Sequence, residues 1–156
     1  MIYLIYDNLL DEADKDNIYV IENAKFQSKA SGLINNDVIG INKNVRSSAQ
    51  RACILAEELG HFHTSSGNIL DQSSVANRKQ ERTARVWAYN RLIGLSGIVE
   101  CYRAGCRNRF EIAEHLGITE TFLADAIACY KEIYGLYAKI DNYVIYFEPL
   151  VVAELI

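Results

Sequence analysis

The stretch A-C-I-L-A-E-E-L-G-H-F-H-T-S-S-G, from Ala52 to Gly67, decides how we expect the rest of the chain to be arranged. Its apolar residues recur at helical spacing, which predicts an amphipathic helix with a core side made of Ile54, Leu55, Leu59 and Phe62. Inside this helix the sequence E-E-L-G-H runs from Glu57 to His61. It differs by one residue from H-E-x-x-H, in which two histidines bind zinc and the glutamate between them is the general base.

The spacing of these residues suits a metal site. Residues four apart lie on the same face of a helix, so Glu57 and His61 can reach one metal ion together. Glu58 is rotated away from that line and can hold a water molecule beside the metal. Carboxylate oxygen and imidazole nitrogen are both zinc ligands. Glutamate in place of the first histidine adds negative charge, weakens the preference for zinc over manganese or other divalent ions, and makes the bound water less acidic.

A zinc site of this kind needs a third protein ligand from a following helix. The best candidate is Glu81, in the sequence E-R-T-A-R-V-W-A. Glu57, His61 and Glu81 would then bind the metal and leave a fourth position for water. Glu58 would accept a proton from that water as it attacks a peptide carbonyl, and would later pass the proton to the leaving amine.

With these motifs the chain resembles the ImmA/IrrE metallopeptidases. The resemblance covers most of the chain and depends on three stretches: A-E-E-L-G-H-F-H-T-S-S-G at residues 56–67, N-R-K-Q-E-R-T-A-R-V-W-A at 77–88, and G-L-I-N-N-D-V-I-G-I-N at 32–42. It implies an intracellular zinc-dependent endopeptidase of a phage, prophage or mobile element. Such an enzyme cleaves a partner protein, typically a helix-turn-helix repressor encoded beside it.

Carried over residue by residue, the resemblance implies Glu58 as the base and His61 and Glu81 as zinc ligands. The chain departs from the family pattern at Glu57, where the family usually has histidine. An alternative therefore stays open, in which the protein is a weak or inactive zincin-like antirepressor that acts by binding its partner.

Each motif also has a simpler explanation. Glutamate pairs on helices usually form a solvated face, and Glu81 alone could pair with Lys79 or Arg85 on the surface. The two motifs together, at the proper distance, favour the metal site. His63 follows His61 by only two residues and so points elsewhere on the helix, which favours a structural or substrate-side role.

Overall composition bounds the class of protein. The 156 residues suit one domain, half of them are apolar, and the formal net charge is -4, which argues against a nucleic-acid partner. The first residues lack the features of a signal peptide and no apolar run reaches transmembrane length, so we expect a cytoplasmic protein with no membrane partner. The four cysteines lack metal-site spacing and are expected to be reduced thiols.

The expected fold is α+β, a mainly helical zincin-like domain with a small antiparallel sheet, helix-turn-helix-like helices and a C-terminal β-hairpin. We expect residues 1–105 to form the catalytic part and residues 106–156 to pack on it within one domain. Strands are expected at 18–22 and on either side of Asn35-Asn36-Asp37, and the closing hairpin at 137–148, ended by Pro149. Helices are expected at 2–14, from about 74 to 92 or 93, and at 98–104.

The helix-turn-helix spacing falls between Glu111 and Tyr130. Its second helix begins with Thr119, Glu120 and Thr121, and it has no basic residue before Lys131. A DNA-reading helix would need Arg, Lys, Asn or Gln to contact phosphates and base edges. We therefore interpret this motif as a packing or protein-docking element, and keep a DNA-binding regulator only as a weaker alternative.

Overall fold

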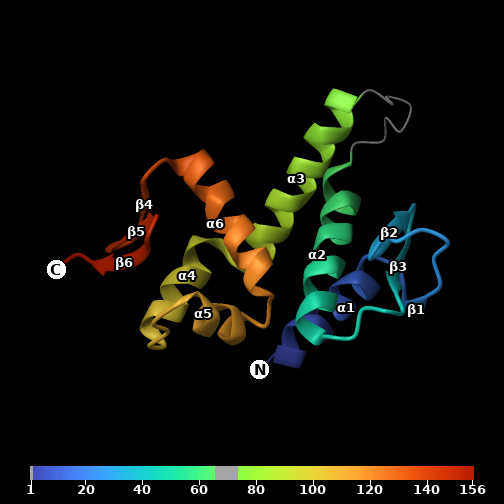
Figure 1. Cartoon of the computed structure of the whole chain (residues 1–156), viewed down its shortest axis with the longest axis horizontal. Helices are drawn as coiled ribbons and strands as arrows, with labels where there is room; N and C mark the ends of the chain where they lie inside the picture. Colours follow the sequence, from blue (N-terminus) through green and yellow to red (C-terminus); the bar gives the residue numbers. More distant parts are fainter. Residues whose placement is uncertain (1, 66–73) are drawn as a thin grey trace.

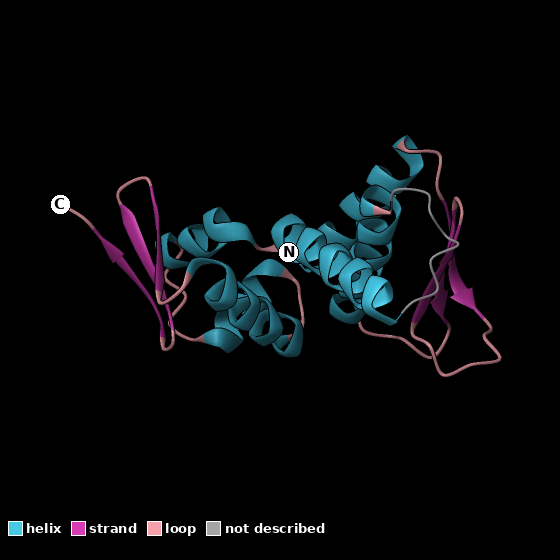
Figure 2. Cartoon of the chain, turned by 90° about the horizontal axis from the view of Figure 1, so that it is seen from above, coloured by secondary structure: helices cyan, strands magenta, loops and turns pink. Residues whose placement is uncertain are grey.

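A computed structural model describes residues 2–65 and 74–156. It has the expected α+β fold, with a helical body between two small sheets that lie at opposite ends of the molecule (Figures 1 and 2). The elements in chain order are α1 (Ile2–Lys15), β1 (Tyr19–Ala24), β2 (Gly32–Asn35), β3 (Val38–Asn42), α2 (Ser48–Thr64), α3 (Ser74–Leu92), α4 (Gly94–Arg103), α5 (Arg109–Leu116), α6 (Glu120–Tyr134), β4 (Tyr137–Ile140), β5 (Tyr143–Phe147) and β6 (Leu150–Glu154).

The N-terminal sheet is mixed, not wholly antiparallel as the sequence suggested. The predicted hairpin is confirmed: β2 and β3 pair antiparallel around a turn in which Asn36 has a φ of 56°. However, β1 lies on the other side of β3 and runs parallel to it, so the strand order is β1-β3-β2. Central strand β3 is the buried one, with Ile39 and Ile41 fully covered. As a result β2 is an edge strand.

Helix α2 forms as predicted and is the element on which the N-terminal part packs. The side chain of Ser47 caps its first turn by accepting a hydrogen bond from the Gln50 N–H. Leu55 and Leu59 are fully buried. The prediction that Phe62 faces the core is wrong, because the residue is 36% exposed; its ring contacts that of the neighbouring His63 edge to face. The sequence T-S-S-G-N at residues 64–68 predicts a break in this helix, and α2 ends there, at Thr64; residues 66–68 lie outside the described residues.

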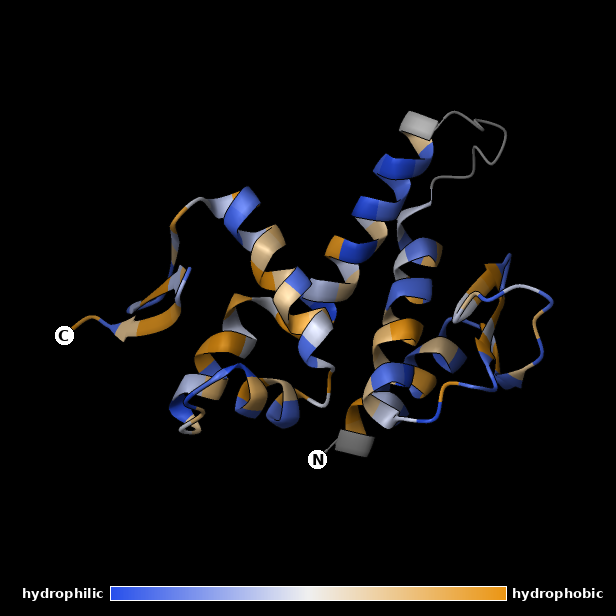
Figure 3. Cartoon of the chain, in the orientation of Figure 1, coloured by the Kyte–Doolittle hydropathy of each residue, from blue (hydrophilic) through white to orange (hydrophobic). Residues whose placement is uncertain are grey.

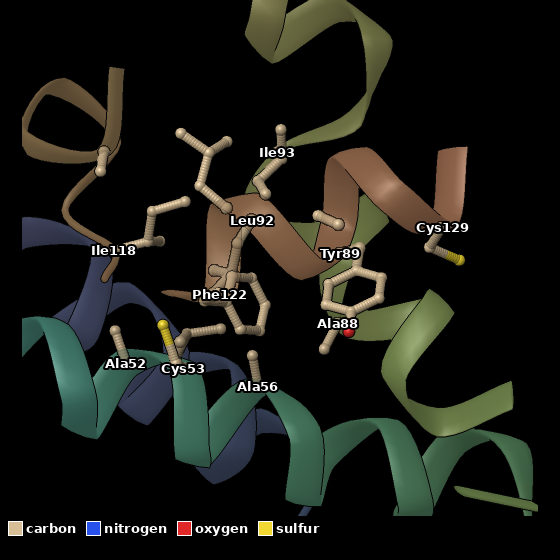
Figure 4. Packing of buried hydrophobic residues seen from close by; sticks show 14 of the residues in the cluster. Ala52, Cys53, Ala56, Ala88, Tyr89, Leu92, Ile93, Ile118, Phe122 and Cys129 are labelled. Carbon is tan, nitrogen blue, oxygen red and sulfur yellow. The ribbon is translucent and has the colours of Figure 1, made fainter. Parts of the chain in front are cut away.

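Helix α3 packs along α2 and connects the two halves of the molecule. Its first half is strongly polar, whereas its second half is mixed and contributes the apolar residues that join the common core (Figure 3). There Ala88 and Tyr89 of α3 meet Ala56 of α2 and Phe122 of α6, with the Tyr89 and Phe122 rings edge to face at 5.1 Å (Figure 4). One continuous apolar core therefore extends from α1 to β5.

The helices after α3 form as the sequence predicted, except that α4 starts earlier. Helix α4 begins at Gly94, earlier than predicted, since Gly94 takes a φ of 64° and turns the chain directly out of α3. Helices α5 and α6 adopt the predicted helix-turn-helix arrangement, with Gly117 left-handed at the end of α5 and Thr119 capping α6. Among the described residues no helix is long and apolar enough to cross a membrane. All four cysteines are free thiols.

The C-terminal hairpin continues into a third strand. Strands β4 and β5 pair as predicted, but Pro149 does not end the structure, because β6 follows it and pairs antiparallel with β5. Proline lies here in the turn before β6, where the ladder needs no N–H donor from it. Ile145 and Phe147 of the central strand are buried against α6 and α4.

The Tyr130 hydroxyl joins α3, α4 and α6 inside the core. It donates a hydrogen bond to Oδ1 of Asn90 at 3.0 Å and accepts one from the Gly94 N–H at 3.2 Å, and the residue is 1% exposed. Replacing Tyr130 by phenylalanine leaves both partners without this hydroxyl. We expect chemical denaturation to show a loss of about 1–2 kcal/mol in the free energy of unfolding. The matched change at Tyr102, which is 40% exposed, should have almost no effect.

Candidate metal centre and active site

A close approach of α2 and α3 brings the two sequence motifs together. At the crossing, Gly60 of α2 lies against the backbone of α3: a Cβ placed on Gly60 would be 2.3 Å from the carbonyl oxygen of Ala84. Only glycine permits this separation. Gly60 and Ala84 are both completely or almost completely buried, so the contact is tight and dry. The residues adjoining this contact, His61 and Glu81, consequently face each other across the helix pair.

His61 and Glu81 are side by side, as the two motifs predicted. Nε2 of His61 lies 3.2 Å from Oε1 of Glu81, with the histidine side chain 21% exposed and the glutamate side chain 53% exposed. The other oxygen of Glu81, Oε2, is 4.0 Å from the Arg85 guanidinium one turn along α3. An imidazole and a carboxylate from two helices therefore converge on one position that solvent can reach.

The two carboxylates of the E-E-L-G-H motif project to different surroundings. Glu58 faces the N-terminal sheet: a Cβ placed on Gly32, at the start of edge strand β2, would be 3.2 Å from Oε1 of Glu58. Glu57 instead lines a cleft between α2 and α6, which Asp125 also lines. This divergence is the one expected for neighbouring residues on a helix.

Burial and mutual repulsion raise the pKa values of both carboxyl groups. For Glu58 the pKa is raised to about 7, first by burial and then by the negative charges of Glu57 and Glu81. For Glu57 burial again raises the pKa most; Arg85 lowers it, and Glu81 and Asp125 raise it further. A carboxyl group with a pKa near neutrality is well matched to general-base work at neutral pH.

The chemistry of these donors suits a divalent cation. A buried group of like charges is relieved by a cation, and imidazole nitrogen with carboxylate oxygen is a normal ligand set for zinc or manganese. The described residues contain no group of three histidine, cysteine, aspartate or glutamate side chains already in position to hold a metal ion. The close pair His61–Glu81 is thus the assembled part of the predicted ligand set, and Glu57 lies within electrostatic range of it.

His63 has a structural position, as the sequence favoured. Its ring stacks on Trp87 of α3, with centroids 4.9 Å apart, and its Nε2 is 3.2 Å from Oδ2 of Asp16 just after α1. It therefore ties the end of α2 to its neighbours. The sequence analysis missed Gly32, which lies beside Glu58, and Asp125, which lies near Glu57. Both are far from their partners along the chain, and a single sequence gives no signal for contacts between distant residues.

The raised pKa of Glu58 gives the metal-free protein an unusual pH dependence. An unfolded glutamate loses its proton near pH 4.3, whereas folded Glu58 keeps it until about pH 7. Between these values the folded state binds more protons, so the free energy of unfolding falls as pH rises, by about 4 kcal/mol for this group. We expect denaturation of chelator-treated protein to show this fall between about pH 4 and pH 7, with little further change above pH 7. Glu58→Gln, which does not titrate, should have a clearly flatter profile; an unchanged profile would contradict the assignment.

Comparison with known proteins identifies the family. No curated protein and no solved structure gives a significant match to the chain. The sequence pattern of the IrrE N-terminal-like domain, Peptidase_M78, matches residues 13–127, from the end of α1 into α6. The matched region contains both helices of the candidate site and the edge strand beside it. The chain belongs to the IrrE N-terminal-like domain family of peptidases, the ImmA/IrrE metallopeptidases.

Proposed function

We propose that this protein is a metal-dependent endopeptidase. The observation that carries the proposal is the pair of His61 and Glu81 at 3.2 Å, next to two carboxyl groups whose pKa values are raised. The family supports a peptidase-like protein. The α2–α3 contact brings together an imidazole and a carboxylate, the kinds of side chain that a metal-dependent peptidase uses as ligands. Zinc is the metal we propose first, with another divalent ion possible because Glu57 stands in place of a histidine.

In this proposal Glu57, His61 and Glu81 hold the metal. When bound, the metal supplies a Lewis acid that polarises the attacking water and the peptide carbonyl. Arg85 lies 4.0 Å from Glu81 and partly offsets the negative charge of the ligands. With only three protein ligands, a tetrahedral metal would keep its fourth coordination position open for water or substrate, as catalysis requires.

Glu58 is the proposed general base. One of its carboxylate oxygens accepts a proton from the attacking water, and the same carboxyl group later donates it to the leaving amine. Its position beside Gly32 suggests how the substrate lies. Among the described residues, edge strand β2 pairs only with β3, so an extended peptide could add to its other side as a further strand and pass over Glu58.

The substrate we propose is a partner protein, such as the helix-turn-helix repressor of a phage or mobile element, in the cytoplasm. This part of the proposal follows from the ImmA/IrrE family alone. Family members are peptidases, and the sequence motifs resemble those of members from temperate phages and integrative elements. Identifying the gene next to this one would name a first substrate to test.

Metal content tests the proposal directly. After incubation with zinc and removal of unbound ions, we expect about one metal ion per chain by plasma mass spectrometry, and a higher melting temperature that chelation reverses. His61→Ala and Glu81→Ala should each weaken binding by at least tenfold, because each removes one ligand. His115→Ala, at an exposed position on α5, is the matched control. If the unchanged protein binds no divalent ion under these conditions, the proposal of a metal-dependent endopeptidase is wrong.

The alternative is an antirepressor that binds its partner without cutting it. The observation in its favour is Glu57, which replaces an imidazole by a charged carboxylate, together with the lack of a complete three-ligand group among the described residues. The two proposals differ in one measurement. With the partner protein and metal present, the enzyme produces two fragments, whereas the antirepressor forms a stable complex with intact partner.

A further inference from the structure

A large cleft, which Glu57 lines, begins at the proposed active site. Its volume is about 920 Å³, within the range of specific binding sites. Glu57 of α2 and the first two turns of α6 form one side of it. The connections between β1 and β2 and between β3 and α2 form the other side. A substrate held over α2 would extend into this cleft.

The two sides of the cleft carry opposite charge. Glu57 and Asp125 lie on the helical side, and Lys25, Lys29 and Lys43 lie on the loop side. The three lysine residues are exposed, and within the described ranges none of them forms a salt bridge. The aromatic rings of Phe26 and Phe122 add apolar surface between them.

The opposite charges of the two walls should make the affinity of the cleft for a peptide depend on the charge of that peptide. Three ammonium groups on one wall attract an anionic side chain, while Glu57 and Asp125 repel it from the opposite wall. An acidic peptide can therefore lie in the cleft in only one favourable way, with its carboxylates toward the loops. A basic peptide would face three like charges on the loop wall, and of the two carboxylates on the opposite wall Glu57 is a proposed metal ligand, so the cleft favours acidic segments.

We propose that this cleft is a substrate subsite selecting polypeptide segments with acidic side chains near the cleaved bond, and that Lys25, Lys29 and Lys43 determine this specificity. The inference rests on the proposed function, since it places the substrate of that same site. Exposed ion pairs contribute up to about 1 kcal/mol each, which corresponds to about fivefold in binding. Three of them acting on one acidic segment should give a preference of at least tenfold over an uncharged segment.

The test uses three synthetic fluorescent peptides that share an apolar centre and differ only in carrying glutamate, glutamine or lysine on either side of it. Zinc-loaded protein gives kcat/KM for cleavage, and the Glu58→Gln variant gives Kd by fluorescence anisotropy without turnover. Both quantities, kcat/KM and Kd, are measured with the three lysine residues unchanged and again with the double change Lys29→Glu and Lys43→Glu. The matched control is Lys15→Glu with Lys139→Glu, which makes the same change in net charge at exposed positions outside the cleft.

We expect the glutamate peptide to be preferred at least tenfold over the glutamine peptide, and the double variant to abolish or invert this preference. The control variant should keep it, and the preference should weaken as salt concentration rises. Cleavage that ignores peptide charge would overturn the inference and leave the peptidase intact. A charge preference in Kd with no cleavage would support the inference and count against the peptidase. Equal Kd values for all three peptides, or no binding of any, would overturn it.

Discussion

Replacing Glu58 by glutamine is expected to lower kcat for cleavage of the partner protein by about 10²- to 10⁴-fold, the usual contribution of a general base. Glutamine has nearly the same size as glutamate, so the packing beside Gly32 should persist. An amide cannot accept the proton of the attacking water at neutral pH. Because Glu58 is not one of the proposed ligands, metal content should stay the same, and only turnover should be lost.

The control for this experiment is Glu114→Gln, at an exposed position on α5 far along the chain from the site. It should leave cleavage and metal content unchanged. Comparison of the two variants separates the loss of a base from a general effect of removing a carboxylate. If Glu58→Gln keeps full activity, Glu58 is not the base and the mechanism proposed above is wrong. If it loses the metal as well, Glu58 acts as a ligand instead.

The helical part of the site could be predicted because its determinants are local. Spacing on one helix fixes Glu57 and His61 on the same face, and a second motif at a suitable distance predicted Glu81 as their partner. The structure brings His61 and Glu81 within 3.2 Å. The burial of Leu55 and Leu59 and the closing hairpin were also predicted, since each depends on residues close together in sequence.

The features that were wrong or missed depend on contacts between distant segments. The turn at Asn35-Asn36-Asp37 determines only how β2 meets β3, and the parallel pairing of β1 with β3 was not encoded in any single turn. Phe62 has the right helical phase for the core, but in the last turn of α2 it is His63 that packs on α3, and Phe62 stays 36% exposed. The closeness of Asp125 to Glu57, and the gathering of lysine residues on one side of the cleft, likewise depend on the folded structure and could not be predicted from the sequence.

Gly60→Ala is expected to have the largest effect on stability, about 3 kcal/mol or more. The added methyl group would lie 2.3 Å from the carbonyl oxygen and 3.0 Å from the carbonyl carbon of Ala84, both backbone atoms of α3. No side-chain rotation can relieve this contact, so the two helices must separate, and overpacking of this kind costs about 1–3 kcal/mol or more. Urea denaturation measures the loss as a lower midpoint at unchanged slope.

Gly97→Ala is the matched control, since Gly97 also lies within a helix and is buried, but its new methyl group would have Leu116 as its nearest neighbour at 4.0 Å. There alanine should stabilise the protein by about 0.5–1 kcal/mol through its better helix propensity. Separation of α2 from α3 should also pull His61 away from Glu81. Gly60→Ala protein that remains folded at low temperature is therefore expected to bind metal at least tenfold more weakly, whereas Gly97→Ala should bind it normally. A Gly60→Ala variant with unchanged stability and unchanged metal affinity would mean that the close helix contact does not hold the site together.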